Sequence, residues 1–176
     1  MAQLKQPITP SDHVQAGDDP VVTLIEYGDY ECPHCGAAQP VVKQILARYG
    51  DRLLFAYRHF PLVEIHPHAG PAAETAEFAG AQGLFWQMHD AIFAYQDQLS
   101  LPTLMALASG LNLSELALRE ALANGVYAPK VQADFMHGVR NGVNGTPAFF
   151  VDGTRHDEGV DSLDAAVGRA ILIAAA

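Results

Sequence analysis

Two cysteines, Cys32 and Cys35, stand three positions apart in the stretch YECPHCGAAQP, and the 176-residue chain holds no others. This spacing suits three kinds of chemistry: a redox-active dithiol, half of a metal site, or two small buried hydrophobic side chains. The residues between them are Pro33 and His34. Proline suits the first turn of a helix, and a protonated histidine favours a nearby thiolate. The dipeptide favours the redox interpretation but leaves the other two open.

A metal site would need ligands from elsewhere in the chain. Structural zinc takes about four ligands, usually from two cysteine pairs or from one pair and two spaced histidines. His66 and His68 are candidates, but only Pro67 separates them, which is closer than the usual ligand spacing. We therefore expect no metal, and we expect packing, capping or solvent exposure to explain these histidines.

The elements around the cysteines predict where the thiols lie. Residues 21–27, VVTLIEY, are apolar on both alternating faces, which is typical of an interior strand. Apolar residues then recur at helical spacing through 41–49, and 52–61 is a second strand candidate, so a right-handed βαβ unit is expected. Cys32 would begin the helix, where free N–H groups and the helix dipole favour a thiolate, and Cys35 would follow one turn later.

The rest of the chain predicts helices and then a hairpin. Residues 66–141 carry alanines and aromatics at three- and four-residue steps, interrupted by helix stop signals. Strand character returns at 147–151, and Asp152-Gly153 is a strong hairpin signal before an edge strand in TRHDEG. A final helix closes the chain. Residues 1–19 are polar and lack a clear period, so we expect an N-terminal arm there.

Composition excludes some functions. Ten Lys and Arg against twenty Asp and Glu give a net charge of −10, which disfavours nucleic acid and anionic lipid as partners. With 49% hydrophobic residues the chain can bury one sizeable core. Its apolar runs are too short for a signal peptide or a membrane span, so we expect a cytoplasmic location, or an exported one if a leader has been removed.

Two distant motifs carry a family resemblance. CPHC preceded by VTLIEYGDYE, together with GVNGTPAFFVDG far downstream, resembles the DsbA-like branch of the thioredoxin superfamily, in particular its short, leaderless bacterial members. The resemblance implies an α/β thioredoxin fold with an all-helical insertion between the βαβ and ββα halves. The arm would span 1–19, the core 20–62 and 144–176, and the insertion 63–143.

The resemblance also implies roles for individual residues. Cys32 would be the attacking thiol, Cys35 the resolving thiol, and Pro33 and His34 the dipeptide that tunes them. Thr146-Pro147 matches the loop opposite the dithiol, where the proline is cis and the preceding residue pairs its backbone with an extended substrate. Without the family, Gly-Thr-Pro is a plain turn before a strand.

Glu26 matches the buried acid of the family. A carboxylate in an apolar strand is costly to bury, so we expect it to be partly protonated, paired, or close to a cavity that reaches water. The resemblance implies proton transfer to or from Cys35. The alternatives are that Glu26 points outward at a strand end or pairs with a cation such as Arg58.

The resemblance implies a thiol:disulfide oxidoreductase that needs no cofactor. Its partners would be cysteine-containing proteins or low-molecular-weight thiols and a redox partner for recycling, with no nucleic acid or membrane partner. Asp29 and Glu31 would raise the pKa of Cys32 if their side chains approached it, against the effect of His34 and the helix start. Direction stays open, with a preference for a moderately oxidising pair. A non-catalytic peptide- or protein-binding module is the alternative, and a glutathione-transferase or isomerase relative is a third.

Overall fold

The computed structural model describes residues 3–175, and two parallel strands form the centre of the protein. These are β2 (Val22–Gly28) and β3 (Leu53–His59), with Glu26 opposite Tyr57. Both strands are buried almost throughout, which explains their apolar and β-branched sequences. Helix α1 (Pro33–Tyr49) and the 3-10 turn η1 (Gly50–Arg52) connect them, so the predicted βαβ unit is confirmed.

Two antiparallel strands extend the sheet on the β2 side. β4 (Ala148–Val151) pairs with β2, and β5 (Thr154–His156) pairs with β4 at the edge. Asp152 and Gly153 join them with φ values of 46° and 75°, and positive φ at both central positions is what the tightest hairpin turn requires. The hairpin predicted from this dipeptide is therefore confirmed, and the order within residues 3–175 is β1-β3-β2-β4-β5.

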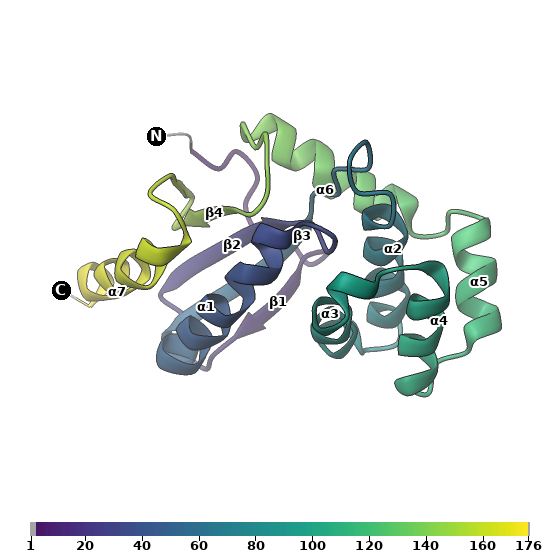
Figure 1. The fold of residues 1–176 in the computed structure, drawn as a ribbon. Coiled ribbons are helices and arrows are strands. Elements are labelled where there is room, and N and C mark those ends of the chain that lie inside the picture. Colours follow the sequence, from purple (N-terminus) through teal and green to yellow (C-terminus); the bar gives the residue numbers. More distant parts are fainter. Residues whose placement is uncertain (1–2, 176) are drawn as a thin grey trace.

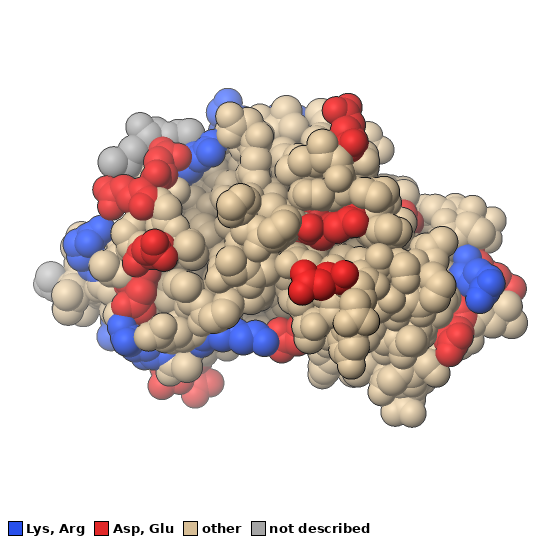
Figure 2. Space-filling view, in the orientation of Figure 1, with Lys and Arg blue, Asp and Glu red and all other residues tan. Residues whose placement is uncertain are grey.

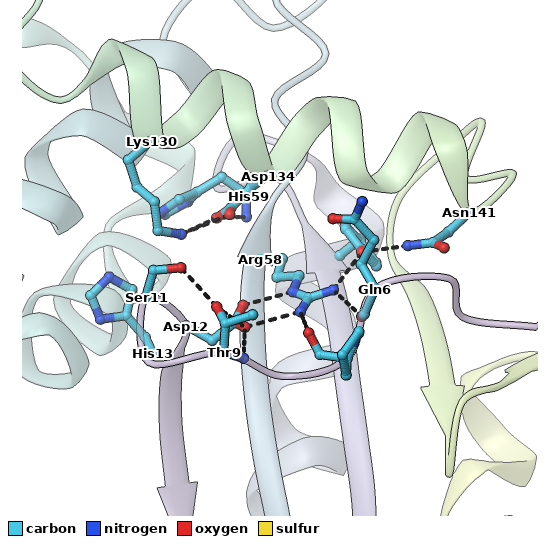
Figure 3. A network of polar contacts seen from close by, with 12 residues as sticks. Gln6, Thr9, Ser11, Asp12, His13, Arg58, His59, Lys130, Asp134 and Asn141 are labelled. Atoms are coloured by element: carbon cyan, nitrogen blue, oxygen red, sulfur yellow. Dashed lines mark hydrogen bonds and ion pairs between the residues drawn. The ribbon is translucent and has the colours of Figure 1, made fainter.

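β1 (His13–Ala16) lies within the stretch expected to be an arm, and the sequence did not predict it. It pairs antiparallel with β3, whose edge would otherwise leave N–H and C=O groups unpaired. Figure 3 shows how Arg58 on β3 anchors the preceding residues. The Arg58 guanidinium donates to Asp12 at 2.7 and 2.9 Å and to the Pro7 carbonyl at 2.9 Å. Long-range pairing, rather than local pattern, creates this strand.

The helices between β3 and β4 form a group beside the sheet (Figure 1). They are α2 (Ala69–Gly80), α3 (Phe85–Ala94), α4 (Leu101–Gly110), α5 (Glu115–Ala123) and α6 (Ala128–Arg140), with the 3-10 turn η2 (Gln96–Gln98) after α3. α6 packs against β3, returning the chain to the sheet. This is the succession of helices that the sequence predicted. The division of the chain into domains at residues 19, 62 and 143 stays a prediction.

α1 and α7 (Leu163–Ala174) pack against each other and against the sheet, after the 3-10 turn η3 (Val160–Ser162). The larger hydrophobic cluster joins α1 and α7 to the helical group through Phe55, Tyr57 and Phe149 on the strands. A smaller cluster on other strand positions contains Tyr27 and Phe150. Since Glu26 and Tyr57 are paired in register, the buried acid lies on the Tyr57 side of the sheet.

Candidate functional site

The two cysteines lie where β2 gives way to α1. Cys32 is the N-cap of α1 with extended backbone, Pro33 is the first helical residue, and Cys35 lies in the first turn. Proline is tolerated there because its missing N–H would have no helical acceptor. Both cysteines are free thiols, 4% and 0% exposed. The predicted position of the dithiol at a strand-to-helix junction is therefore confirmed.

The two thiols have opposite acidities. Hydrogen bonding from Cys35 lowers the pKa of Cys32 to about 5, helped by Thr146 and by the N–H groups of Cys35 and His34 against the effect of burial. Burial raises the pKa of Cys35 far above its ordinary value, with a further increase from its hydrogen bond to Cys32 and from the charge of Glu26. At neutral pH, Cys32 is a thiolate and Cys35 a protonated thiol, the pattern of an attacking and a resolving cysteine.

The Thr146-Pro147 loop faces the dithiol from the start of β4. Its peptide bond is cis, and the Cys32 Sγ lies 3.5 Å from the Thr146 carbonyl oxygen. Sequence alone left the isomer open, since X-Pro bonds permit both. The loop thus lies opposite the dithiol, as the resemblance implied.

A groove of about 290 Å³ runs beside this loop. It is lined by His34, Ala37, Thr146, Pro147, Phe149, His156, Gly159 and Val160. Its size is near the lower limit for small-molecule pockets, so it suits a short extended segment better than a large cofactor. His34 and Pro33 are exposed at the helix start, with His34 on the groove wall. His156 was not predicted, because only the folded hairpin carries it there.

Glu26 is fully buried, and neither carboxyl oxygen has a hydrogen-bond partner within residues 3–175. Burial raises its pKa to about 8, so it is mainly protonated at neutral pH. Arg58 does not pair with it: the guanidinium binds Asp12 and donates to the Tyr27 hydroxyl at 2.9 Å. The alternative of a Glu26–Arg58 pair is therefore wrong, because alternate strand residues point to opposite faces.

The carboxyl oxygens of Asp29 and Glu31 are bound by backbone N–H groups and by histidines. Asp29 accepts from the Leu62 N–H at 2.9 Å and lies 2.7 Å from His66 Nδ1. Glu31 accepts from the His68 N–H at 2.6 Å and lies 2.9 Å from its Nδ1. The pKa of Cys32 is set by hydrogen bonds and by burial, and the charge of neither acid is among the causes of its shift. The pairs also account for both histidines.

One cluster among the described residues has the composition of a metal site. Oxygen and nitrogen atoms of His59, Glu77 and Asp134 lie within 4.8 Å of one another. Lys130 already supplies a positive charge there: its Nζ lies 2.6 Å from Asp134, as Figure 3 shows for this pair. The same Nζ lies 3.9 Å from Glu77. We assign this cluster to the packing of α2 and α6 against β3.

The sequence also missed Gln96 in η2. Its amide donates to the carbonyls of Tyr30 and Cys32 at 2.7 and 2.9 Å. No local pattern marks a glutamine as the partner of a turn 64 positions away. On the outside, Figure 2 shows that the middle of the face over α1 is mainly uncharged, with both acidic and basic side chains at its border. The described residues contain no helix that is long and apolar enough to cross a membrane.

Comparison with solved structures identifies the fold. BdbD from Bacillus subtilis is 22% identical with a TM-score of 0.85, over 97% of this chain and 98% of that one. The α-DsbA1 protein of Wolbachia pipientis is 21% identical with a TM-score of 0.83, over 98% and 96%. A thioredoxin-like oxidoreductase from Silicibacter pomeroyi is 25% identical with a TM-score of 0.74, over 92% and 93%. The fold is the predicted thioredoxin fold with an all-helical insertion.

Curated relatives are more similar in sequence but much longer. A Na(+)/H(+) antiporter NhaA 1 from Salinispora arenicola is 41% identical over 167 residues, which cover 93% of this chain and 26% of that protein. NhaA 1 from a Mycobacterium species is 37% identical over 156 residues, covering 87% and 25%. This chain thus spans about a quarter of the relatives that it matches.

The family model described as thioredoxin matches residues 9–168, which include the dithiol, the helical group and the Thr146-Pro147 loop. A DsbA-type fold with this dithiol supports thiol–disulfide oxidoreductase chemistry in general. The chain therefore belongs to the thioredoxin family, and its fold, with the helical insertion, is similar to that of the DsbA-like structures that it matches.

Proposed function

We propose that this chain is a thiol:disulfide oxidoreductase that exchanges disulfides with cysteine-containing proteins or small thiols. The observation that carries the proposal is the position of Cys32 at the N-cap of α1, beside the cis Thr146-Pro147 loop, with Cys35 buried in the first turn. This position lowers the pKa of Cys32, whereas burial raises that of Cys35. Cys32 is the more accessible of the two, and the Thr146-Pro147 loop and the groove lie beside it. A structural cysteine pair would need neither the difference in acidity nor the open groove.

In the reducing direction, the Cys32 thiolate attacks one sulfur of a substrate disulfide. The substrate S–S bond breaks, a mixed disulfide forms, and the substrate leaves its first sulfur as a thiolate. Cys35 then loses its proton and attacks the Cys32 sulfur, which releases the second substrate thiolate and leaves a Cys32–Cys35 disulfide. The protein loses two electrons and the substrate gains them. The oxidising direction runs through the same mixed disulfide in reverse.

Glu26 is the proposed proton acceptor for Cys35. Its carboxyl group lies close enough for its charge to raise the pKa of Cys35, and its own pKa of about 8 permits ionisation near neutral pH. We propose that the backbone of Thr146 pairs with an extended substrate, and that His34 contacts substrate from the groove wall.

The direction we propose is moderately oxidising. Interactions that stabilise the Cys32 thiolate stabilise the reduced protein. Its Cys32–Cys35 disulfide is therefore readily reduced, and it oxidises other thiols. A redox partner must then recycle the dithiol. Equilibration with glutathione buffers of varied ratio measures the potential. A value near the roughly −270 mV typical of thioredoxin would contradict this direction.

The experiment for the function is disulfide exchange with a small disulfide-linked peptide, followed by alkylation and mass analysis. With the peptide disulfide in large excess, which drives exchange in the reducing direction, we expect wild-type protein to lose two free thiols as the peptide is reduced. We expect Cys32→Ser to exchange at a negligible rate. Exchange by Cys32→Ser at the wild-type rate would refute the assignment. A non-catalytic binding module remains the alternative, and dithiols that never form a reversible disulfide would favour it.

The antiporter name of the curated relatives is not part of this proposal. What the chain shares with those proteins is a region of about a quarter of their length, and the thioredoxin family model covers nearly all of that region here. The proposed chemistry therefore follows the dithiol rather than the relatives' names.

A further inference from the structure

Gln96 connects the helical group to the turn on which the dithiol stands. Its side-chain Nε2 donates to the carbonyl of Tyr30 at 2.7 Å and to that of Cys32 at 2.9 Å. The residue lies in η2, between α3 and α4, whereas both acceptors lie between β2 and α1. One half-buried side chain from the insertion thus holds both ends of a three-residue turn.

The Cys32 carbonyl has a second donor that belongs to α1. The N–H of Gly36 donates to it at 3.1 Å, which is the first hydrogen bond of the active-site helix. The N–H groups of His34 and Cys35, which lower the pKa of Cys32, belong to this same first turn. Since their direction depends on the position of the turn, a group that fixes the Cys32 carbonyl also fixes the donors around the sulfur.

Gly36 leaves the space that the Gln96 carboxamide occupies. A Cβ atom at position 36 would lie 2.1 Å from Gln96 Oε1 and 2.9 Å from its Cδ, so any larger residue must displace the amide. Glycine weakens a helix interior compared with alanine. Its presence in the first turn of α1 is explained by the space that the carboxamide occupies. Because the displaced atoms end a flexible side chain, an alanine here can be accommodated without disturbing the sheet.

We propose that Gln96 is a positioning residue for the dithiol, and that its carboxamide, seated over Gly36, holds the Cys32 turn in its reactive geometry. The helical insertion thereby affects the reactivity of Cys32 through a single side chain. The inference rests on the proposed function, but its first readout is the titration of Cys32, which needs no substrate.

The first test is the pKa of Cys32, measured by thiolate ultraviolet absorbance and by the pH dependence of alkylation. Gln96→Leu, which removes the donors at similar volume, should raise this pKa by about half a unit or more. Gln96→Glu should raise it further, because a carboxylate replaces the donor and adds negative charge. Gln98→Ala is the matched control, because Gln98 lies in the same 3-10 turn and is exposed, and it should leave the pKa unchanged.

The second test is coupling between the two positions. Gly36→Ala should raise the pKa of Cys32 as Gln96→Leu does, and should change it little when added to Gln96→Leu, since no amide remains to displace. The redox equilibrium of the dithiol with glutathione should shift in parallel with the pKa of Cys32. A rise of half a unit makes the Cys32–Cys35 disulfide about threefold easier to form when Cys32 is ionised in the wild type.

An unchanged pKa of Cys32 in both Gln96→Leu and Gly36→Ala would overturn the positioning role. An equal effect of Gly36→Ala with and without Gln96 would also overturn it. If Gln96→Leu loosens the helical group, Gly36→Ala still tests the contact, because it leaves that group intact. Wild-type protein without exchange activity would refute the proposed function while the titration stays readable. Normal exchange with an unchanged pKa in both variants would refute only the positioning role.

Discussion

Replacing Glu26 by glutamine should make the protein more stable, and increasingly so as the pH rises. Glu26 is fully buried on β2, and its oxygens lack a partner among the described residues. Its pKa is therefore raised from 4.5 to about 8 by burial alone. Between these two pKa values the folded protein keeps the Glu26 proton, whereas the unfolded chain has already lost it. The wild type therefore becomes less stable as the pH increases.

The size of the effect follows from the two pKa values. The free energy of unfolding of the wild type falls by about 1.4 kcal/mol for each pH unit between the pKa of Glu26 in the unfolded chain and its pKa in the folded protein. Below pH 4.5 Glu26 is protonated in both states and causes no loss of stability. Relative to that range, the free energy of unfolding is lower by about 3 kcal/mol at pH 7 and by about 5 kcal/mol above pH 8. Glutamine keeps the shape and a neutral polar head but cannot ionise. The Glu26→Gln advantage should therefore grow over this range and then level off.

Urea unfolding of the reduced proteins at pH 5, 7 and 8.5, followed by circular dichroism, measures this difference. Glu64→Gln at an exposed loop position controls for the general loss of a carboxylate. The informative quantity is the change of the stability difference with pH, because any pH-independent cost of burying the amide cancels. A Glu26→Gln difference that stays constant from pH 5 to 8.5 would refute the reasoning.

Three further outcomes follow from other contacts. Alkylation of Cys32 should rise with an inflection near pH 5, and an inflection near 8.5 would contradict the thiolate assignment. Arg58→Met leaves the buried Asp12 unpaired and should cost about 3 to 5 kcal/mol in urea unfolding at pH 7; a loss under 1 kcal/mol would contradict it. Gly138→Ala should destabilise the protein by about 1 to 3 kcal/mol, because the added Cβ would lie 2.6 and 2.7 Å from two ring atoms of the buried Phe60. Gly110→Ala, whose Cβ would meet no described atom within 4 Å, should stabilise it slightly, and equal effects of the two variants would contradict this expectation.

The sequence predicted the parts of the fold that depend on local pattern. The apolar run of β2 and the helical period after it placed Cys32 and Cys35 at the strand-to-helix junction. Asp152-Gly153 predicted its hairpin because those residue types tolerate positive φ. β1 could not be predicted in this way, since its four residues become a strand only through the edge of β3.

The missing parts of the site depend on contacts between distant residues. Gln96 reaches the Cys32 turn only because the helical group packs beside α1, and nothing in its neighbourhood marks that role. The charges of Asp29 and Glu31 had been expected to oppose the thiolate if they approached it. Glu31 and one oxygen of Asp29 instead bind the segment before α2, and the other oxygen of Asp29 accepts from the Glu31 N–H. Sequence cannot tell where a short acidic side chain will point.

The central claim is that Cys32 attacks and Cys35 resolves, and trapping tests it most directly. Cys35→Ser protein, mixed with a disulfide-linked peptide, should accumulate a mixed disulfide at Cys32 that mass spectrometry detects and reductant releases. Cys32→Ser should accumulate none under the same conditions. Absence of any adduct on Cys35→Ser while the wild type exchanges disulfides, or equal trapping by Cys32→Ser, would contradict the account.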